Sequence, residues 1–202
     1  MQRFQEVLKQ RTRWVTVIAE DVYHLHNASA IVRSCEAFGI QDVHVIEEKL
    51  GKRIDKEIAL GAQKWTSIKK YNSTKKCITH LKQQGYAIVA TTLDNEAFTP
   101  NNLPIDTPMA IVFGTEKDGV SNTVSKQADY KLSIPMYGFT ESLNVSVAAA
   151  IILQTLSIRL RASKLSWQLS SDEITMLFQD WVKQSVKDWR KILAHYQKKN
   201  VN

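Results

Sequence analysis

Short apolar segments alternate with amphipathic segments along most of this chain. Apolar strands are expected at residues 14–19, 43–46, 65–69, 87–92, 109–113 and 130–134. Helices are expected between them over 27–38, 73–84 and 122–127, and a longer one over 144–161. Because the apolar residues are consecutive, both faces of each strand should be covered by helices. The pattern therefore predicts an α/β fold with a largely parallel six-stranded sheet and helices on both faces.

Two further helical segments flank this pattern. Residues 3–11 place apolar side chains on one side. A second helix is expected over residues 171–198, with Ser170 or Ser171 as its N-cap. We expect three parts: an N-terminal helical extension at 1–13, a core domain at 14–162 and a C-terminal helical extension at 163–202.

The charge and the absence of several patterns narrow the function classes. The chain has 27 Lys and Arg against 20 Asp and Glu, a formal net charge of +7 that favours a polyanionic partner such as nucleic acid. Cys35 and Cys77 form no CxxC pair, and the histidines have no metal-ligand spacing, so we expect reduced thiols and no metal. The N-terminus lacks an apolar signal core, and the longest apolar run, Val145–Leu153, is too short to cross a bilayer. These features predict a cytoplasmic protein without a membrane anchor.

The first chemically suggestive segment is the expected helix at 27–38. Arg33 lies beside the small residues Ala30 and Ala37, which leave its planar guanidinium room to reach a phosphate. The alternative is a solvated arginine paired loosely with Glu36 or Glu20.

Two polar turns at the ends of expected strands suggest a pocket for a small cofactor. Gly114–Val120 follows the strand at 109–113, and Ser133–Gly138 leads to the polar helix start Ser142–Asn144. Ligands of open α/β sheets bind at the carboxyl ends of the strands. The first turn is not GxGxxG, which disfavours a nicotinamide enzyme.

Together these segments resemble the three motifs of a known family. They read Asn-x-x-Ala-Ile-x-Arg-x5-Gly from Asn27, Gly-x-Glu-x-x-Gly from Gly114, and Ile-Pro-Met-x-Gly from Ile134 with Ser-Leu-Asn-Val-Ser-x-Ala from Ser142. In sequence, order and spacing they resemble the SpoU (TrmH-like) RNA ribose 2′-O-methyltransferases of the SPOUT superfamily. The resemblance implies a C-terminal trefoil knot, S-adenosylmethionine bound in it, and a homodimer.

The resemblance also implies roles for individual residues. Cofactor binding falls on Thr91, Gly114, Ile134, Met136, Ser142 and Leu143. The positions near the reacting centre are Asn27, Arg33, Glu116 and Asn144, with Ser142 also nearby. A purely structural interpretation makes Asn27 and Asn144 helix caps and Glu116 a turn carboxylate, and the two interpretations are compatible.

Two assignments of the proton acceptor remain open. Guanidinium stays protonated at any working pH, so Arg33 is a poor direct base. We expect it to hold an adjacent RNA phosphate that takes or orients the hydroxyl proton. The rival hypothesis makes Glu116 the base.

Basic residues near both ends resemble the extensions of the family members that methylate guanosine 18 in the tRNA D-loop. The expected RNA contacts are Arg3, Arg11, Arg13, Arg159, Arg161 and Lys164. The expected substrate is therefore tRNA, with ribosomal RNA and the tRNA wobble ribose as alternatives. A non-catalytic RNA-binding protein with the same fold is the alternative from another class.

Overall fold

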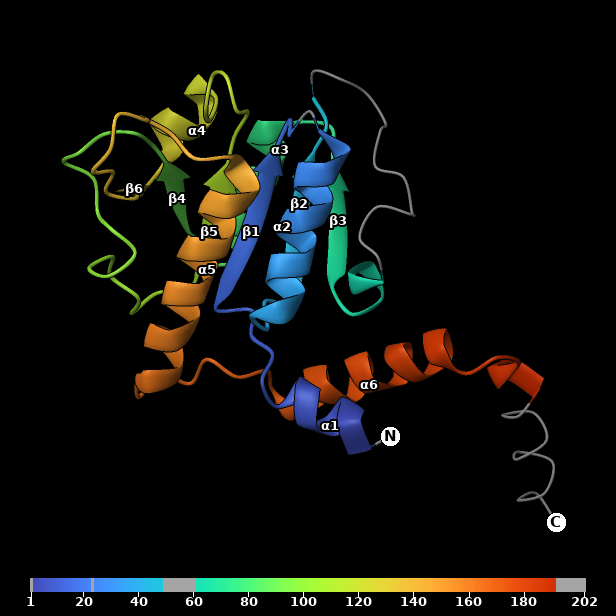
Figure 1. Cartoon of the computed structure of the whole chain (residues 1–202). Coiled ribbons are helices and arrows are strands. Elements are labelled where there is room, and N and C mark those ends of the chain that lie inside the picture. Colours follow the sequence, from blue (N-terminus) through green and yellow to red (C-terminus); the bar gives the residue numbers. More distant parts are fainter. Residues whose placement is uncertain (1, 23, 49–60, 192–202) are drawn as a thin grey trace, which may run out of the picture. The chain divides into compact units, whose positions relative to one another are not determined.

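The computed structural model describes residues 2–22, 24–48 and 61–191. Its central feature is a six-stranded sheet with every strand pair parallel (Figure 1). The strands are β1 (Val15–Glu20), β2 (Asp42–Ile46), β3 (Ser67–Tyr71), β4 (Ala87–Thr91), β5 (Met109–Phe113) and β6 (Tyr130–Leu132), in the order β3-β2-β1-β5-β4-β6. The predicted α/β class and six-stranded sheet are confirmed.

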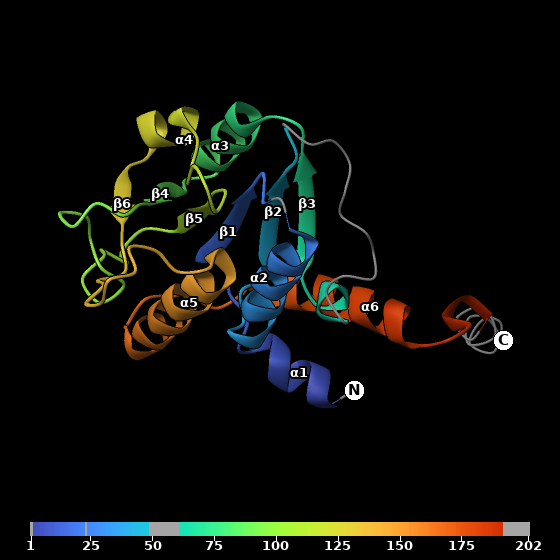
Figure 2. The ribbon, with the colours of Figure 1, turned by 45° about the horizontal axis from the view of Figure 1, so that its top comes forward.

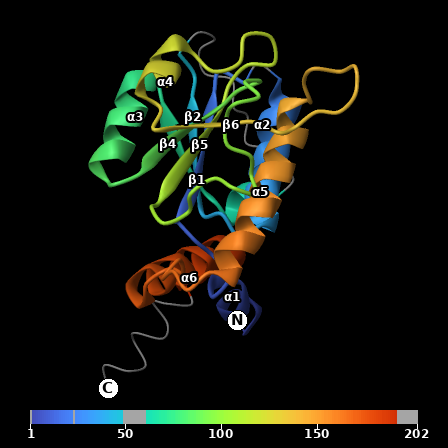
Figure 3. The same cartoon turned by 90° about the vertical axis from the view of Figure 1, so that its left-hand side faces the viewer.

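Helices cover both faces of the sheet (Figures 2 and 3). One face carries α2 (Leu25–Ala37) and α5 (Val145–Ala162), and the other carries α3 (Thr74–Gln83) and α4 (Asn122–Gln127). Strand β5 shows why its residues are apolar without interruption. Met109, Ile111 and Phe113 pack with the α2 and α5 side, while Ala110 and Val112 pack with the α3 and α4 side.

The strand order places a natural ligand site beside β1 and β5. The chain extends the sheet in one direction through β2 and β3, and in the other through β5, β4 and β6. The sheet therefore grows on both sides of β1, and in open parallel sheets of this kind a crevice opens at the carboxyl ends of the strands.

Several element boundaries differ from the prediction. Strand β3 begins at Ser67 rather than residue 65, because Trp65 closes a short 3-10 helix, Ala62–Lys64, in a helical backbone conformation. Strand β6 ends at Leu132 rather than residue 134, because the N–H of Ser133 turns away to the carbonyl of Phe98 at 2.8 Å. The predicted loop at 47–64 falls largely outside the described residues.

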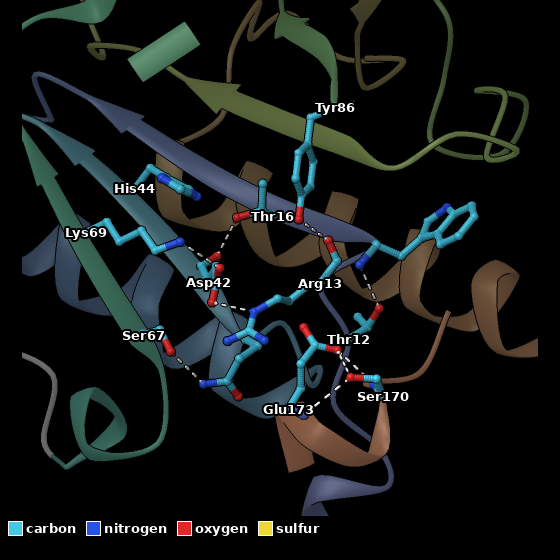
Figure 4. Close-up of polar contacts among 12 residues, drawn as sticks. Thr12, Arg13, Thr16, Asp42, His44, Ser67, Lys69, Tyr86, Ser170 and Glu173 are labelled. Carbon is cyan, nitrogen blue, oxygen red and sulfur yellow. Dashed lines mark hydrogen bonds and ion pairs between the residues drawn. The ribbon is translucent and has the colours of Figure 1, made fainter. Parts of the chain in front are cut away.

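The chain divides into two compact units, residues 12–168 and residues 1–11 with 169–202. The second unit contains α1 (Gln2–Leu8) and α6 (Ser171–Ser185). The ring of Phe4 meets Phe178 and Trp181 edge-on at centroid distances of 6.2 and 5.8 Å. Ser170 and Glu173 form a capping box at the start of α6 (Figure 4).

The prediction of one continuous helix over 171–198 is wrong in its described part. Helix α6 ends at Ser185, and the backbone of Asp188 has a positive φ of 59°, which an α-helix does not accommodate. A new helical turn begins at Trp189, and residues 192–198 lie outside the described part of the chain.

Helix α5 alone among the described helices has the length and composition of a membrane-spanning segment. The same test is passed by core helices of proteins with no membrane contact, and seven of its residues are buried, including Ala149, Leu153 and Leu156. This part of α5 belongs to the core on the α2 side of the sheet.

Candidate active site

A pocket of about 530 Å³ opens at the carboxyl edge of the sheet. Its walls come from the ends of β4 and β5, the turn after β5, the segment after β6 and the first half of α5. All six residues predicted to bind the cofactor line it: Thr91, Gly114, Ile134, Met136, Ser142 and Leu143. Segments up to 61 residues apart in sequence, from Thr91 to Ile152, therefore meet around one cavity.

The turn after β5 is folded tightly on itself. The N–H of Thr115 donates to the carbonyl of Gly119 at 2.9 Å, and the reverse bond measures 3.0 Å. A Cβ on Gly114 would lie 2.1 Å from that same carbonyl oxygen, so no larger residue fits there. Gly119 has a φ of 67°, which side chains disfavour. Both glycines are required by a closed turn that presents Glu116 between them.

Three predicted catalytic residues meet in one polar cluster. The Glu116 Oε1 atom accepts the Nδ2 of Asn27 at 2.7 Å and the Nδ2 of Asn144 at 2.8 Å. The Asn144 Nδ2 atom also donates to the Asn27 Oδ1 at 3.2 Å. Glu116 lines the pocket, so the cluster joins its wall, and Glu116 orients both amides.

Asn144 is both a cap and a member of this cluster. Its Oδ1 accepts the backbone N–H of Ser146 at 2.9 Å and the Ser146 hydroxyl at 2.6 Å, so the amide oxygen faces α5 and the Nδ2 faces Glu116. Asn27 is not a cap, because α2 begins at Leu25 and its N-cap position is His24. Asn27 lies in the first turn of α2, with its side chain committed to Glu116.

Arg33 lies on the same helix six residues beyond Asn27, about 9 Å further along the axis. Its side chain is exposed, and it forms no hydrogen bond or ion pair with any residue in the described ranges. The alternative pairing with Glu36 or Glu20 is therefore absent from the described structure. The guanidinium is available to an anionic ligand.

The predicted RNA contacts separate into two groups. The first consists of arginines whose side chains contact other residues of the protein. Arg11 is fully buried with its guanidinium 5.4 Å from the ring centre of Trp181. The Arg13 Nε donates to Asp42 at 3.2 Å, beside Lys69, whose Nζ lies 3.3 Å from the same carboxylate (Figure 4).

Two arginines of α5 are similarly engaged. Arg159 donates to the carbonyl of Pro100 at 2.8 Å, and Arg161 donates to the carbonyl of Phe38 at 3.1 Å and to Ser157. Burial lowers the pKa of both guanidinium groups below its usual value. These contacts favour a structural role for both. In contrast, Arg3 is exposed with only an ion pair to Glu6 at 3.4 Å, and Lys164 is exposed.

Sequence reasoning missed two residues of this edge. His24 Nε2 lies 3.7 Å from Glu116 Oε2, and Glu20 is a buried carboxyl group at the end of β1. No local pattern marks His24. Glu20 carried a signal, since a carboxyl group ending an otherwise apolar strand needs buried hydrogen-bond donors.

The described residues contain no group of three or more side chains suited to holding a metal ion. A parallel sheet with a small-molecule pocket at its carboxyl edge and a carboxylate-amide cluster in the pocket wall defines a ligand-binding α/β protein of the enzyme type. The chain belongs to the SpoU rRNA Methylase family, whose profile matches residues 14–154.

Sequence and structural similarity to individual proteins is consistent with membership of this family. The chain is 42% identical over 188 residues to a tRNA (guanosine(18)-2′-O)-methyltransferase of Borreliella burgdorferi, covering 93% of this chain and 86% of that one. The crystal structure of a TrmH/SpoU tRNA modifying enzyme of Aquifex aeolicus has a TM-score of 0.79 and 36% identity, covering 92% and 96% of the two chains. The SpoU methyltransferase AviRb of Streptomyces viridochromogenes, solved with AdoMet, shares the fold at a TM-score of 0.67 and 21% identity, covering 78% and 65%.

Proposed function

We propose that this chain transfers a methyl group from S-adenosylmethionine to the ribose 2′-oxygen of guanosine 18 in tRNA. The observation that carries the proposal is the Asn27, Glu116 and Asn144 cluster in the wall of the pocket. Membership of a methylase family and the close relative named for guanosine 18 support the reaction and the target.

The pocket fits a cofactor of this kind. Its volume of about 530 Å³ lies within the roughly 300–1,000 Å³ typical of small-molecule sites. Apolar side chains such as Ile134, Leu143 and Ile152 suit an adenine ring, while Thr91 and Ser142 offer hydroxyl groups. When bound, S-adenosylmethionine supplies a methyl group on a sulfonium sulfur, which a ribose oxygen can displace.

Arg33 and Glu116 divide the remaining work. The exposed Arg33 holds the RNA phosphate next to the acceptor ribose, and that phosphate receives the proton of the 2′-hydroxyl. Glu116 fixes the amide groups of Asn27 and Asn144, so that both are already oriented when the RNA arrives. In this account Glu116 orients groups and does not act as the base.

A homodimer is part of the proposal, and the exposed face of α5 supports it. Val147, Ile151 and Ile158 repeat at helical spacing and are 39–58% exposed. Such an apolar stripe is a typical contact between subunits. Replacing Ile151 by Asp should yield monomers in light scattering, whereas an unchanged mass for wild type and variant at the monomer value would contradict the dimer.

The trefoil knot is also part of the proposal. The chain leaves β6 at one edge of the sheet and returns as α5, which packs with α2 nearer the centre (Figure 1). The connection between β4 and β5 is hydrogen-bonded to the segment after β6 and to α5. The carbonyl of Phe98 accepts the N–H of Ser133 after β6, and the carbonyl of Pro100 accepts a hydrogen bond from Arg159 of α5. This arrangement supports a return of the chain past that connection, as a knot requires.

The RNA contacts and location complete the proposal. Arg33 contacts the phosphate next to the acceptor ribose, and the exposed Arg3 and Lys164 bind other phosphates of the RNA. We place the protein in the cytoplasm, where tRNA is modified and where the buried thiols of Cys35 and Cys77 stay reduced.

The test is methyl transfer from labelled S-adenosylmethionine to unmodified tRNA and, separately, to ribosomal RNA, with the labelled nucleotide mapped. Label on the ribose of guanosine 18 is expected. Label in ribosomal RNA or at the wobble ribose would keep the chemistry and overturn the target. Cofactor binding without transfer to either RNA would favour a non-catalytic RNA-binding protein.

A further inference from the structure

Glu20 places a buried carboxyl group at the carboxyl end of β1, where its side chain joins two distant segments. The residue is 3% exposed. Its Oε1 accepts the hydroxyl of Thr74 at 2.7 Å and the hydroxyl of Ser121 at 2.7 Å, and its Oε2 accepts the backbone N–H of Ser121 at 2.8 Å. These donors are 54 and 101 residues away in the chain, and all are neutral.

The Ser121 side of this contact is tied to the pocket. Ser121 is the N-cap of α4, and its hydroxyl also accepts the N–H of Val124 at 3.3 Å. It follows directly after the closed turn Gly114–Val120, seven residues that all line the pocket. Glu20 therefore fixes the point where this wall of the pocket ends.

The beginning of the same turn is fixed by the residue next to Glu20. Ala19 of β1 pairs with Phe113, the last residue of β5. Two consecutive residues of β1 thus hold both ends of the turn, one through the sheet and the other through its side chain. Between these ends the turn presents Glu116, which in turn holds Asn27 and Asn144.

The Thr74 side of the contact leads away from the pocket. Thr74 is the first residue of α3, and no residue of α3 lines the pocket. The two hydrogen bonds that Glu20 Oε1 accepts, from the hydroxyl groups of Thr74 and Ser121, have the same length but come from different parts of the fold. This asymmetry separates a role in the site from a role in folding.

We propose that Glu20 is a positioning residue for the reaction: it sets the turn that carries Glu116 and forms one wall of the cofactor pocket. Glu20 does not line the pocket, so it acts through Ser121 and the turn rather than on the substrate. The inference rests on the proposed function for its chemistry, but its geometry is independent of which RNA is methylated. An unsatisfied donor left at this buried point is costly, so the turn should shift when the carboxyl group is changed.

The test compares Glu20→Gln and Ser121→Ala with Thr74→Val as the matched control. Ser121→Ala and Thr74→Val each remove one hydroxyl donor from Glu20 Oε1. Ser121 lies on the side of the turn, and Thr74 lies on the side of α3. We expect Glu20→Gln and Ser121→Ala to raise the Kd of S-adenosylmethionine about tenfold, which equals about 1.4 kcal/mol. Thr74→Val should leave that Kd within about twofold, while it should lower the melting temperature by about as much as Ser121→Ala does. The affinity for tRNA should not change in any of the three.

Hydrogen exchange of the peptide covering residues 114–121 gives a readout that needs no ligand. Faster exchange is expected there in Glu20→Gln and Ser121→Ala and not in Thr74→Val, since the paired amides of Thr115 and Gly119 lose their support. Equal effects of all three variants, or exchange in the turn unchanged by Glu20→Gln, would overturn the inference. A wild-type protein that binds the cofactor but methylates no tRNA would contradict the proposed target and leave this comparison intact.

Discussion

Asn144 gives the sharpest separation between stability and activity, because one side chain performs both tasks. Its Oδ1 caps α5 through Ser146, and its Nδ2 donates to Glu116 at 2.8 Å and to Asn27 at 3.2 Å. Serine at this position keeps a capping oxygen and removes the amide. Alanine removes both. The two variants therefore divide the side chain into its cap and its cluster contacts.

The magnitudes follow from these contacts. Loss of a helix cap costs about 1 kcal/mol, so Asn144→Ala should be less stable than Asn144→Ser by about that amount, since both variants lose the amide contacts and only alanine loses the cap. The Glu116 carboxylate is 40% exposed, so each lost amide bond is placed at about 1 kcal/mol rather than at the upper end of its range. Two such bonds made in the reacting complex amount to about 2 kcal/mol, or roughly a 30-fold loss of turnover.

Urea unfolding measures the stability difference, and single-turnover methyl transfer at saturating cofactor measures the activity difference. Both variants should lose about the same activity, although Asn144→Ala is the less stable of the two. If Asn144→Ser retained turnover within about threefold of wild type, the amide would not be needed by the cluster. The reasoning from these hydrogen bonds would then be refuted.

Three further predictions follow from single sites. Arg33→Ala should abolish turnover while calorimetry shows unchanged cofactor binding, and retained turnover would contradict its role at the RNA phosphate. Gly114→Ala should abolish cofactor binding, because its Cβ would lie 2.1 Å from the carbonyl of Gly119, whereas the control Gly138→Ala, with nothing within 4 Å, should bind normally. Burial lowers the pKa of His44 from 6.5 to about 4, so the unfolded chain binds more protons between these values and stability falls as the pH drops below 6.5. The loss should be about 2 kcal/mol between pH 7 and pH 5 in urea unfolding, and His44→Gln should flatten this slope.

The sheet could be predicted because its information is local. Strands β4 and β5 are largely apolar runs, and packing on both faces accounts for β5, where Ile111 and Val112 point to opposite sides of the sheet. The errors occurred where a contact from elsewhere decides the boundary. Strand β6 is two residues shorter than predicted because Phe98 accepts the N–H of Ser133.

The site was predictable to the extent that its residues occur in motifs. The motif pattern placed Asn27, Glu116 and Asn144 in one group, and they share hydrogen bonds in the structure. The arrangement itself was not predictable, because Asn27 lies 89 residues from Glu116 and could equally have capped its own helix.

The basic residues show the limit of reasoning from charge. Arg13 and Arg161 look alike in sequence to Arg3, but only the tertiary structure places Asp42 beside Arg13 and the carbonyl of Phe38 beside Arg161. Charge counts predict an anionic partner for the whole chain and do not identify which side chains reach it.

The most direct test of the central claim changes a single atom of the substrate. Two tRNA molecules are prepared that differ only at position 18, one with guanosine and the other with 2′-deoxyguanosine, and each is incubated with the protein and labelled S-adenosylmethionine. The account predicts one methyl group per guanosine-18 tRNA and none on the deoxy form, which lacks the acceptor oxygen. Equal labelling of both molecules would show that the methyl group goes elsewhere and would contradict the assignment of this site to the 2′-oxygen of guanosine 18.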